Sequence, residues 1–172
     1  MKNSSAYDPI TLRRVGAGDL ELLRRHRNDP GTRVWLENCH EITVAEQLAW
    51  HDNGGSEGVR IAVLAGEDIG LSRLSMNSAL AEALVGLDIF QRYRSKGLAK
   101  SVFYETCREA CAAGARRLAL WVFWDNEPAV HVYRAQNFVI DESEPVKWFV
   151  RQFPQEIRPA PHAYIKMTRG AW

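Results

Sequence analysis

The residues best suited to chemistry lie within positions 87–99, where a short apolar run turns basic and then meets a glycine. Arg92, Arg94 and Lys96 precede Gly97, and a helical pattern follows at once. The first N–H groups of a helix have no intrahelical partner, and the helix dipole adds positive potential there. Glycine lets the backbone approach an anion closely, and arginine can bind two oxygens at once. The segment predicts a phosphate-binding loop, and the alternative is an ordinary solvated turn.

A second block follows the next apolar strand pattern, residues 118–124. Asn126 comes directly after that strand, and Tyr133 and Phe138 follow on and just after an expected helix. Pro128 suits the first turn of that helix, because an N–H group is not needed there. This second block, at this distance after the basic loop, favours a binding loop at residues 92–97 over an ordinary solvated turn.

Together the two blocks resemble the GNAT superfamily of N-acetyltransferases. Arg94-x-x-Gly97-x-Ala99 is similar to its acyl-CoA pyrophosphate loop, and the close match covers about residues 84–138. The resemblance implies an α/β fold: a single GNAT-like domain over residues 1–172 with a mixed, mostly antiparallel, twisted sheet. Helices would flank that sheet, and its central strands would be splayed. It also implies acetyl-CoA as the cosubstrate and no metal.

The resemblance assigns residues one by one. The backbone around Leu87 and Ile89 would pair with the pantetheine arm, and Asn126 would lie near it where the central strands part. The positions that match cosubstrate-binding residues are Leu87, Ile89, Arg94, Ser95, Lys96, Gly97, Leu98, Ala99 and Asn126. Three positions depart from the family pattern, since Ser95, Ala99 and Asn137 replace frequent glycines. Serine and alanine are small, and asparagine tolerates a positive φ.

Tyr133 matches the family's usual general acid. A thiolate leaving group has a pKa of about 8.5 and a phenol one of about 10, so the phenol can hydrogen-bond or protonate it. The alternative is a core tyrosine on an amphipathic helix. The position seven residues after Asn126 favours the catalytic role.

No general base is evident, and the acceptor side is less well defined. Asp88 and Glu82 are carboxylates on or near the central strand, and ordinary edge or hairpin charge is the alternative for both. Trp121 stands where some relatives carry a glutamate. The missing carboxylate favours an amine of low pKa, with water relaying the proton. Trp35, Glu37 and Asp88 are the expected substrate-binding residues, and an ordinary core edge is the alternative for the tryptophan-rich segment 33–50.

The N-terminal segment narrows the resemblance further. Residues 25–30, Arg33-x-Trp35 and residues 42–50 resemble the branch containing ribosomal-protein N-terminal acetyltransferases and nucleotide-amino-sugar N-acetyltransferases. This match does not choose between those substrates.

The elements expected to position these residues alternate along the chain. Strands are expected at residues 10–15, 59–64, 68–75, 82–90, 118–124, 138–140 and 163–168. Helices are expected at 20–27, 43–51, from 98 to near 114, and 127–136, with residues 33–41 irregular. Thr43-x-x-Glu46 is a capping box for the second helix, and residues 65–67 form a hairpin turn. This interleaving predicts a sheet covered by helices.

Composition limits the class of protein. The 172 residues are 46% hydrophobic and 25% charged with a formal net charge of +1, which gives no field to attract nucleic acid or anionic lipid. We expect no membrane segment, because no long apolar run occurs. We also expect a cytoplasmic location, because the three cysteines, Cys39, Cys107 and Cys111, are an odd number without metal-ligand spacing, which suits a reducing compartment. Acetyl-CoA and an amine are the expected partners, and a homodimer stays open.

The sequence therefore predicts an acyltransferase. We expect a primary amine, either a peptide N-terminus or a small amine such as an amino sugar, to attack the thioester directly without a covalent enzyme intermediate. The alternative is a non-catalytic acyl-CoA-binding or interaction module on the same fold.

Overall fold

The computed structural model describes residues 9–149 and 161–171, so residues 1–8, 150–160 and 172 of the expected domain lie outside it. In the described part, eight strands form one open sheet in the order β1-β2-β3-β4-β5-β8-β6, with β7 also paired to β8. The strands are β1 (Thr11–Arg14), β2 (Val59–Leu64), β3 (Glu67–Asn77), β4 (Glu82–Ile89), β5 (Arg117–Phe123), β6 (Val139–Ile140), β7 (Lys147–Phe149) and β8 (His162–Gly170). The helices are α1 (Leu20–Asn28), α2 (Pro30–Arg33), α3 (Val44–Asp52), α4 (Leu98–Ala112) and α5 (Glu127–Arg134), with 3₁₀ turns η1 (Ala17–Asp19) and η2 (Gln91–Tyr93).

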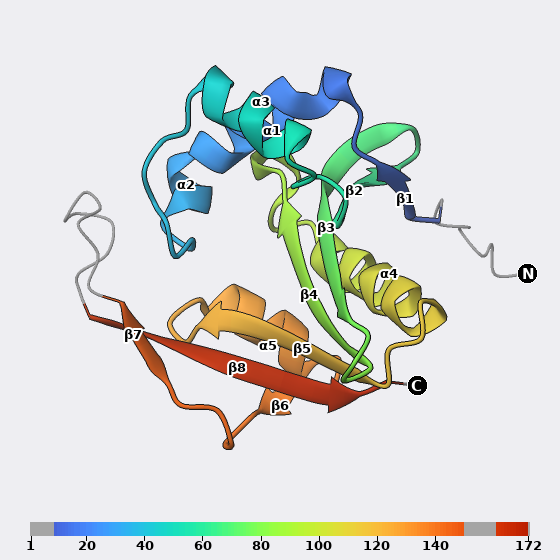
Figure 1. The fold of residues 1–172 in the computed structure, drawn as a ribbon, viewed down its shortest axis with the longest axis vertical. Helices are drawn as coiled ribbons and strands as arrows, with labels where there is room; N and C mark the ends of the chain where they lie inside the picture. The colour runs from blue at the N-terminus through green and yellow to red at the C-terminus, as the bar shows by residue number, and fades with distance from the viewer. Residues whose placement is uncertain (1–8, 150–160, 172) are drawn as a thin grey trace, which may run out of the picture.

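The expected α/β fold is confirmed. All strand pairs are antiparallel except β4 with β5, which gives the mixed, mostly antiparallel sheet. Figure 1 shows α1, α2 and α3 gathered at one end of the molecule and β5, β8 and α5 at the other, with β3 and β4 running between them.

The bounds of most helices and strands lie within a few residues of those expected from the sequence. Thr43 Oγ1 accepts from Glu46 N at 3.2 Å, and Glu46 Oε2 accepts from Thr43 N at 2.7 Å, so the capping box forms. The expectation that residues 33–41 are wholly irregular holds only after Arg33, because α2 was not expected. Asp29 ends α1 and also precedes α2, whose first residue is Pro30, so the chain turns and re-enters a helix without a linker.

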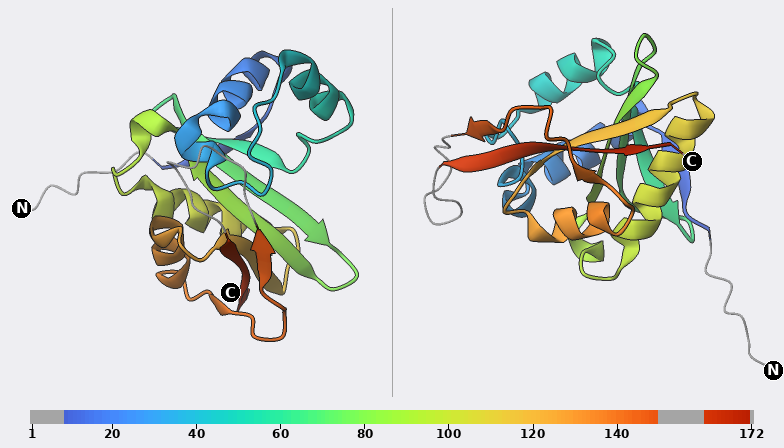
Figure 2. Two further views of the ribbon diagram at one scale, coloured as in Figure 1. Left: turned by 90° about the vertical axis from the view of Figure 1, so that its left-hand side faces the viewer. Right: turned by 90° about the horizontal axis from the view of Figure 1, so that it is seen from below.

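Strand register separates the sheet into two unlike faces. Side chains alternate between faces along a strand, so Val85 and Leu87 point one way while Asp88 points the other. Thr106 of α4 donates to Ser72 Oγ of β3 at 2.9 Å, which places α4 on the Val85 face. Figure 2 shows α1 and α3 on the opposite side of the sheet from α4 and α5.

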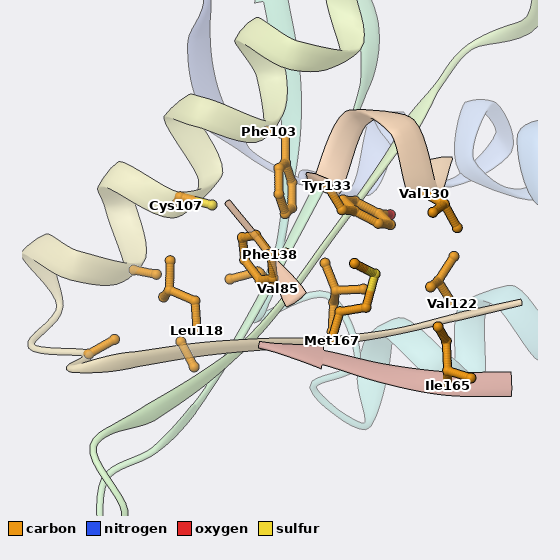
Figure 3. Close-up of a cluster of buried hydrophobic side chains, with 14 residues drawn as sticks. Val85, Phe103, Cys107, Leu118, Val122, Val130, Tyr133, Phe138, Ile165 and Met167 are labelled. Carbon is orange, nitrogen blue, oxygen red and sulfur yellow. The ribbon is translucent and has the colours of Figure 1, made fainter. Parts of the chain in front are cut away.

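A dry core fills the space between the sheet and the two C-terminal helices (Figure 3). Phe103 of α4 packs against Tyr133 of α5 with ring centroids 4.9 Å apart, and Phe138 lies 5.4 Å from Phe103. Leu118, Leu120 and Met167 complete the layer, each almost fully buried. Burying a side chain of this size contributes roughly 1.5–3 kcal/mol, so this cluster fixes α4 and α5 against the sheet.

The sheet opens in its centre. The parallel ladder between β4 and β5 covers only Glu82–Leu84 against Arg117–Ala119, although β4 stays paired to β3 as far as Ile89. Beyond Leu84 the β5-facing edge of β4 has no ladder partner in the described chain, and beyond Ala119 the same holds for the β4-facing edge of β5. The splayed central strands expected from the resemblance are therefore present.

Candidate active site

A cleft of about 530 Å³ occupies the opening between β4 and β5. Because the opening passes through the sheet, the cleft joins the face under α4 and α5 to the face under α1 and α2. Most of the residues expected at the site lie around it. Those lining it are Trp35, Leu87, Asp88, Ile89, Arg94, Ser95, Gly97, Leu98, Ala99, Asn126 and Tyr133.

Two expected residues do not line this cleft. Lys96 is exposed and its Nζ lies 5.2 Å from the centre of the Tyr93 ring. Glu37 is also exposed, but it hydrogen-bonds Tyr164, which does line the cleft. Burial and this hydrogen bond raise the pKa of Tyr164 above its usual range. Glu37 thus belongs to the rim of the cleft rather than to its wall.

The loop before α4 has the geometry of an anion cradle. Ser95 and Gly97 both adopt a positive φ, +61° and +76°, and Gly97 is the N-cap of the fifteen-residue α4 without a side-chain cap. In the described chain, the N–H groups of residues 95–97 donate no hydrogen bond. Successive N–H groups in alternating conformations form an anion-binding concavity, and the helix dipole adds to it. The positive φ at Ser95 also explains why glycine is frequent in the family at that position.

Arg94 is held by protein contacts instead of facing the loop freely. Its Nη2 donates to Thr32 Oγ1 at 2.6 Å, its Nη1 to Asp29 Oδ2 at 3.2 Å and its Nε to the Ile89 carbonyl at 3.1 Å. A Cβ at Gly31 would lie 2.8 Å from Arg94 Nη1, so a side chain there would displace the guanidinium from its present position. Arg94 therefore ties the start of α2 to the end of β4.

Tyr133 reaches the cleft from the dry core. Its side chain is only 6% exposed, and the ring packs beside Phe103 while the hydroxyl points away from it (Figure 3). In the described chain no hydrogen bond is made by that hydroxyl. Burial, followed by the negative charge of Asp88, raises the pKa of Tyr133 above its usual range, so the phenol stays protonated and able to donate.

Asn126 starts the helix that carries Tyr133. Its Oδ1 accepts from Ala129 N at 3.3 Å, and Pro128 occupies the first turn of α5. This N-cap sets the direction of α5 from the end of β5. Asn126 thus positions Tyr133 as well as lining the cleft.

Asp88 is an ionised carboxylate on the opposite face. Burial would raise its pKa, but the charge of Arg73 and the proximity of His26 outweigh it and hold the pKa at about 2. Arg73 forms an ion pair with Asp88 Oδ2, and His26 Nε2 lies 3.8 Å from the same oxygen, beyond hydrogen-bonding distance. A general base works best with a pKa near the operating pH, so this carboxylate is poorly suited to take a proton.

The other candidates for acid–base or nucleophilic roles lie elsewhere. Glu82 pairs with Arg117 at 3.3 Å and with Lys166 at 3.5 Å, and His131 is exposed on α5. Burial raises the pKa of Cys107 to about 12, so its thiol stays protonated. No group of three or more His, Cys, Asp or Glu side chains in residues 9–149 and 161–171 could hold a metal ion.

Arg73 and Tyr164 help to form the cleft wall although the sequence did not indicate them. Arg73 enters from β3, and Tyr164 of β8 stacks on Trp121 with ring centroids 5.5 Å apart. Lys147 Nζ lies 3.7 Å from the centre of the Trp121 ring, although Lys147 does not itself line the cleft. The alternation of β8 could have shown that Tyr164 and Lys166 share a face, but only the register with β5 brings Tyr164 to the cleft.

Comparison with known proteins agrees with this geometry. A family model described as the acetyltransferase (GNAT) family matches residues 20–138. No curated protein matches the chain in sequence. None of the helices in the described segments is long and apolar enough to cross a membrane.

Solved structures share the fold at low sequence identity. A spermidine N-acetyltransferase from Vibrio cholerae, in complex with CoA and spermine, is 20% identical with a TM-score of 0.77, covering 94% of this chain and 95% of that one. An N-acetyltransferase from Staphylococcus aureus Mu50 is 16% identical with a TM-score of 0.75, covering 96% and 100%. A ribosomal-protein-alanine N-acetyltransferase from Brucella melitensis is 16% identical with a TM-score of 0.72, covering 93% and 99%.

Proposed function

Because this chain belongs to the acetyltransferase (GNAT) family and is an acyltransferase, we propose that it transfers the acetyl group of acetyl-CoA to a primary amine. The acceptor is a peptide N-terminus or a small amine, and the amine attacks the thioester directly. The observation that carries this proposal is the single cleft that joins the 95–99 loop, the open edge of β4 and the Tyr133 side chain.

The cleft fits acetyl-CoA on two observations of this chain. The N–H groups of residues 95–97 have no partner in the described chain, and they suit the pyrophosphate oxygens. The β5-facing edge of β4 beyond Leu84 has no ladder partner there either, and it suits the amide groups of a pantetheine arm. Leu87, Ile89 and Asn126 would then line the arm, and Leu98 and Ala99 would support the pyrophosphate.

Tyr133 would act where the carbon–sulfur bond breaks. As the amine nitrogen bonds to the carbonyl carbon, electron density moves to the sulfur, and the neutral phenol can hydrogen-bond or protonate the departing thiolate. The acceptor must enter from the Asp88 face, because α4 and α5 close the other face. Trp35, Glu37 and Asp88 line or border that entrance, and water would carry away the amine proton because Asp88 is paired with Arg73.

The rival proposal is an acyl-CoA-binding module without turnover. The observation that favours it is that the cleft carboxylate is already ionised and paired. The two proposals separate in one assay. Purified protein, acetyl-CoA and a panel of primary amines should release free thiol and yield an acetylated amine detectable by mass spectrometry. Acetyl-CoA binding without an acetylated product from any amine would favour the binding module.

Two glycines at opposite ends of α4 give a matched test of the loop. Gly97 and Gly114 both have a positive φ, and no atom lies within 4 Å of an added Cβ at either position. Gly97→Ala and Gly114→Ala therefore impose similar backbone strain, about 1–2 kcal/mol. Acetyl-CoA at about 100 times its Kd should stabilise the wild type by about 2.7 kcal/mol. The resulting rise in Tm should persist in Gly114→Ala and shrink in Gly97→Ala, and equal rises would remove the loop from the binding site.

A further inference from the structure

A second cavity, of about 360 Å³, lies between α1, α3 and the surface of β2 and β3. It is on the Asp88 face of the sheet, on the side away from α4 and α5. Thr32, Leu36 and Arg73 line both this cavity and the central cleft. The two spaces are therefore neighbours separated by a thin wall of three side chains.

The wall of the second cavity is mostly apolar. Its apolar members come from both helices, the following loop and the sheet: Leu23, Leu36, Ile42, Trp50, Val59 and Leu71. An engineered apolar cavity of ~150 Å³ holds a benzene ring, so this one has room for a substituted ring. The cavity is open to solvent on one side, so a small molecule can enter it from outside.

Two buried polar side chains line the same cavity without a hydrogen-bond partner. Gln47 is only 5% exposed, and in the described chain its amide makes no hydrogen bond. His26 Nε2 is buried and has no hydrogen-bond partner, and Asp88 Oδ2 lies 3.8 Å from it. Buried polar groups in native proteins are nearly always paired, so His26 Nε2 is a position where a bound molecule could supply a partner. The Gln47 amide is not fully enclosed, and it can hydrogen-bond a molecule in the cavity.

The charges around the cavity do not suit a second ammonium group. Arg27 and Arg73 are cationic, and Arg27 donates to the carbonyls of Asn38 and His40. The acid there, Glu46, accepts hydrogen bonds from both N and Oγ1 of Thr43 in the capping box. A polyamine placed in this cavity would bring its extra positive charge next to Arg27, and Asp88 near the cavity is already paired with Arg73, so no free carboxylate is there to compensate that charge.

We propose that this second cavity binds the body of the acceptor, and that the acceptor is a primary amine with an uncharged, largely apolar body of about one ring. One hydrogen-bonding group on that body would satisfy Gln47, and the amine would pass Arg73 into the central cleft. This inference rests on the proposed function, because it assumes that the amine is acetylated near Tyr133. It separates this chain from its spermidine-acetylating structural neighbour, whose acceptor is polycationic.

Three amines test this division. We take 2-phenylethylamine as the ring-bearing acceptor, propylamine as a small acceptor without a ring, and spermidine as the polycation. With acetyl-CoA, kcat/KM for 2-phenylethylamine should exceed that for propylamine by about 10-fold or more, because burial of the ring is favourable. Spermidine should be no better than propylamine, and a preference for spermidine would overturn the proposal.

Filling the cavity should remove the advantage of the ring. Gln47→Phe places a ring in the cavity, whereas Leu48→Phe adds the same ring to the next position of α3, which is 46% exposed and outside the cavity. Gln47→Phe should lower kcat/KM for 2-phenylethylamine by about 10-fold and leave propylamine within about 2-fold. Leu48→Phe should change neither. Equal effects of Gln47→Phe on both amines would contradict an acceptor-body pocket.

A binding measurement keeps this inference separate from the acetyltransferase proposal. The rise in Tm caused by 2-phenylethylamine, with CoA present, should occur in the wild type and in Leu48→Phe but not in Gln47→Phe. If that pattern appears without any acetylated product, the pocket stands and the proposed function fails. If amines are acetylated but neither Gln47→Phe nor Val59→Phe on the opposite wall alters the ring preference, the function stands and the pocket fails.

Discussion

The two faces of the sheet differ in how completely their side chains are packed. Under α4 and α5, Val85, Phe103 and Met167 belong to a continuous apolar core with almost no exposure. Under α1 and α3, Arg73 is 44% accessible, Asp88 is paired but ionised, and Gln47 faces a cavity. The same strands supply both faces, so the difference comes from the alternate residues of each strand.

Because of this difference in packing, one face has a structural role and the other can bind an acceptor. The packed face fixes the direction of α4 and α5, and with it the 95–99 loop and Tyr133. The other, hollow face has its own apolar cluster, which includes Leu20, Leu23 and Leu71, but beside it lie a cavity and the Arg73–Asp88 ion pair, which allow this face to receive an acceptor of particular shape. Substitutions on the packed face should therefore change stability, and those at the boundary should change chemistry.

The largest expected effect is at the boundary, in Tyr133→Phe. The ring and its contact with Phe103 remain, so Tm should change little, but the proton donor is lost. General acid catalysis contributes roughly 10²–10⁴ in rate, so kcat should fall by about that factor while the Kd for acetyl-CoA is unchanged. Single-turnover kinetics measures the chemical step directly. A near-wild-type rate in that experiment would indicate that Tyr133 is a core residue of the packed face and has no catalytic role.

A smaller effect is expected for Asp88→Asn on the hollow face. The folded-state pKa of Asp88 is about 2, below the ordinary value of 3.8, so its ionised form stabilises the fold above pH 4. The wild type should exceed Asp88→Asn in unfolding free energy by about 2 kcal/mol between pH 5 and 8. This advantage should shrink as the pH falls from 4 towards 2, where Asp88 becomes protonated. Urea unfolding at several pH values measures it, and a difference independent of pH down to 2 would argue against this ion pair.

The smallest effect is expected at the end of α5. Asn137 has a φ of 65°, and the next residue, Phe138, donates to the Tyr133 carbonyl at 3.1 Å. Asn137→Ala should lower the unfolding free energy by about 1 kcal/mol, whereas Asn137→Gly should change it by a few tenths of that. The urea midpoints of the two variants provide the comparison. Equal losses would show that side-chain contacts, and not the left-handed conformation, set the cost.

The sequence predicted the packed face better than the hollow one. Alternation and capping signals are local, so Asn126 and the tolerance of Asn137 for a positive φ could be recognised in the chain. The capping box of Thr43 is equally local and marks the start of α3, but it says nothing of the cavity under that helix. The position of Arg73 depends on its pairing with Gly86 and on a register shift between Ala62 and Val63, which no local pattern reveals.

Long-range contacts explain the remaining differences. Arg94 matched a phosphate-binding position, but its hydrogen bonds to Asp29 and Thr32 join segments that are distant in sequence. The second cavity likewise arises from the packing of α1 and α3 on β2 and β3. From the sequence alone, Gln47 cannot be distinguished from any other polar residue of a helix. The identity of the acceptor depends on this packing.

The most direct test of the account is a crystal structure of the protein with CoA bound. We expect the pyrophosphate oxygens to accept hydrogen bonds from the N–H groups of residues 95–99 and the pantetheine arm to run along β4 beyond Leu84. The sulfur should lie within hydrogen-bonding reach of the Tyr133 hydroxyl, directly or through one water. CoA bound outside the β4–β5 opening, or a sulfur remote from Tyr133, would contradict the assignment of the cleft as the acetyl-transfer site.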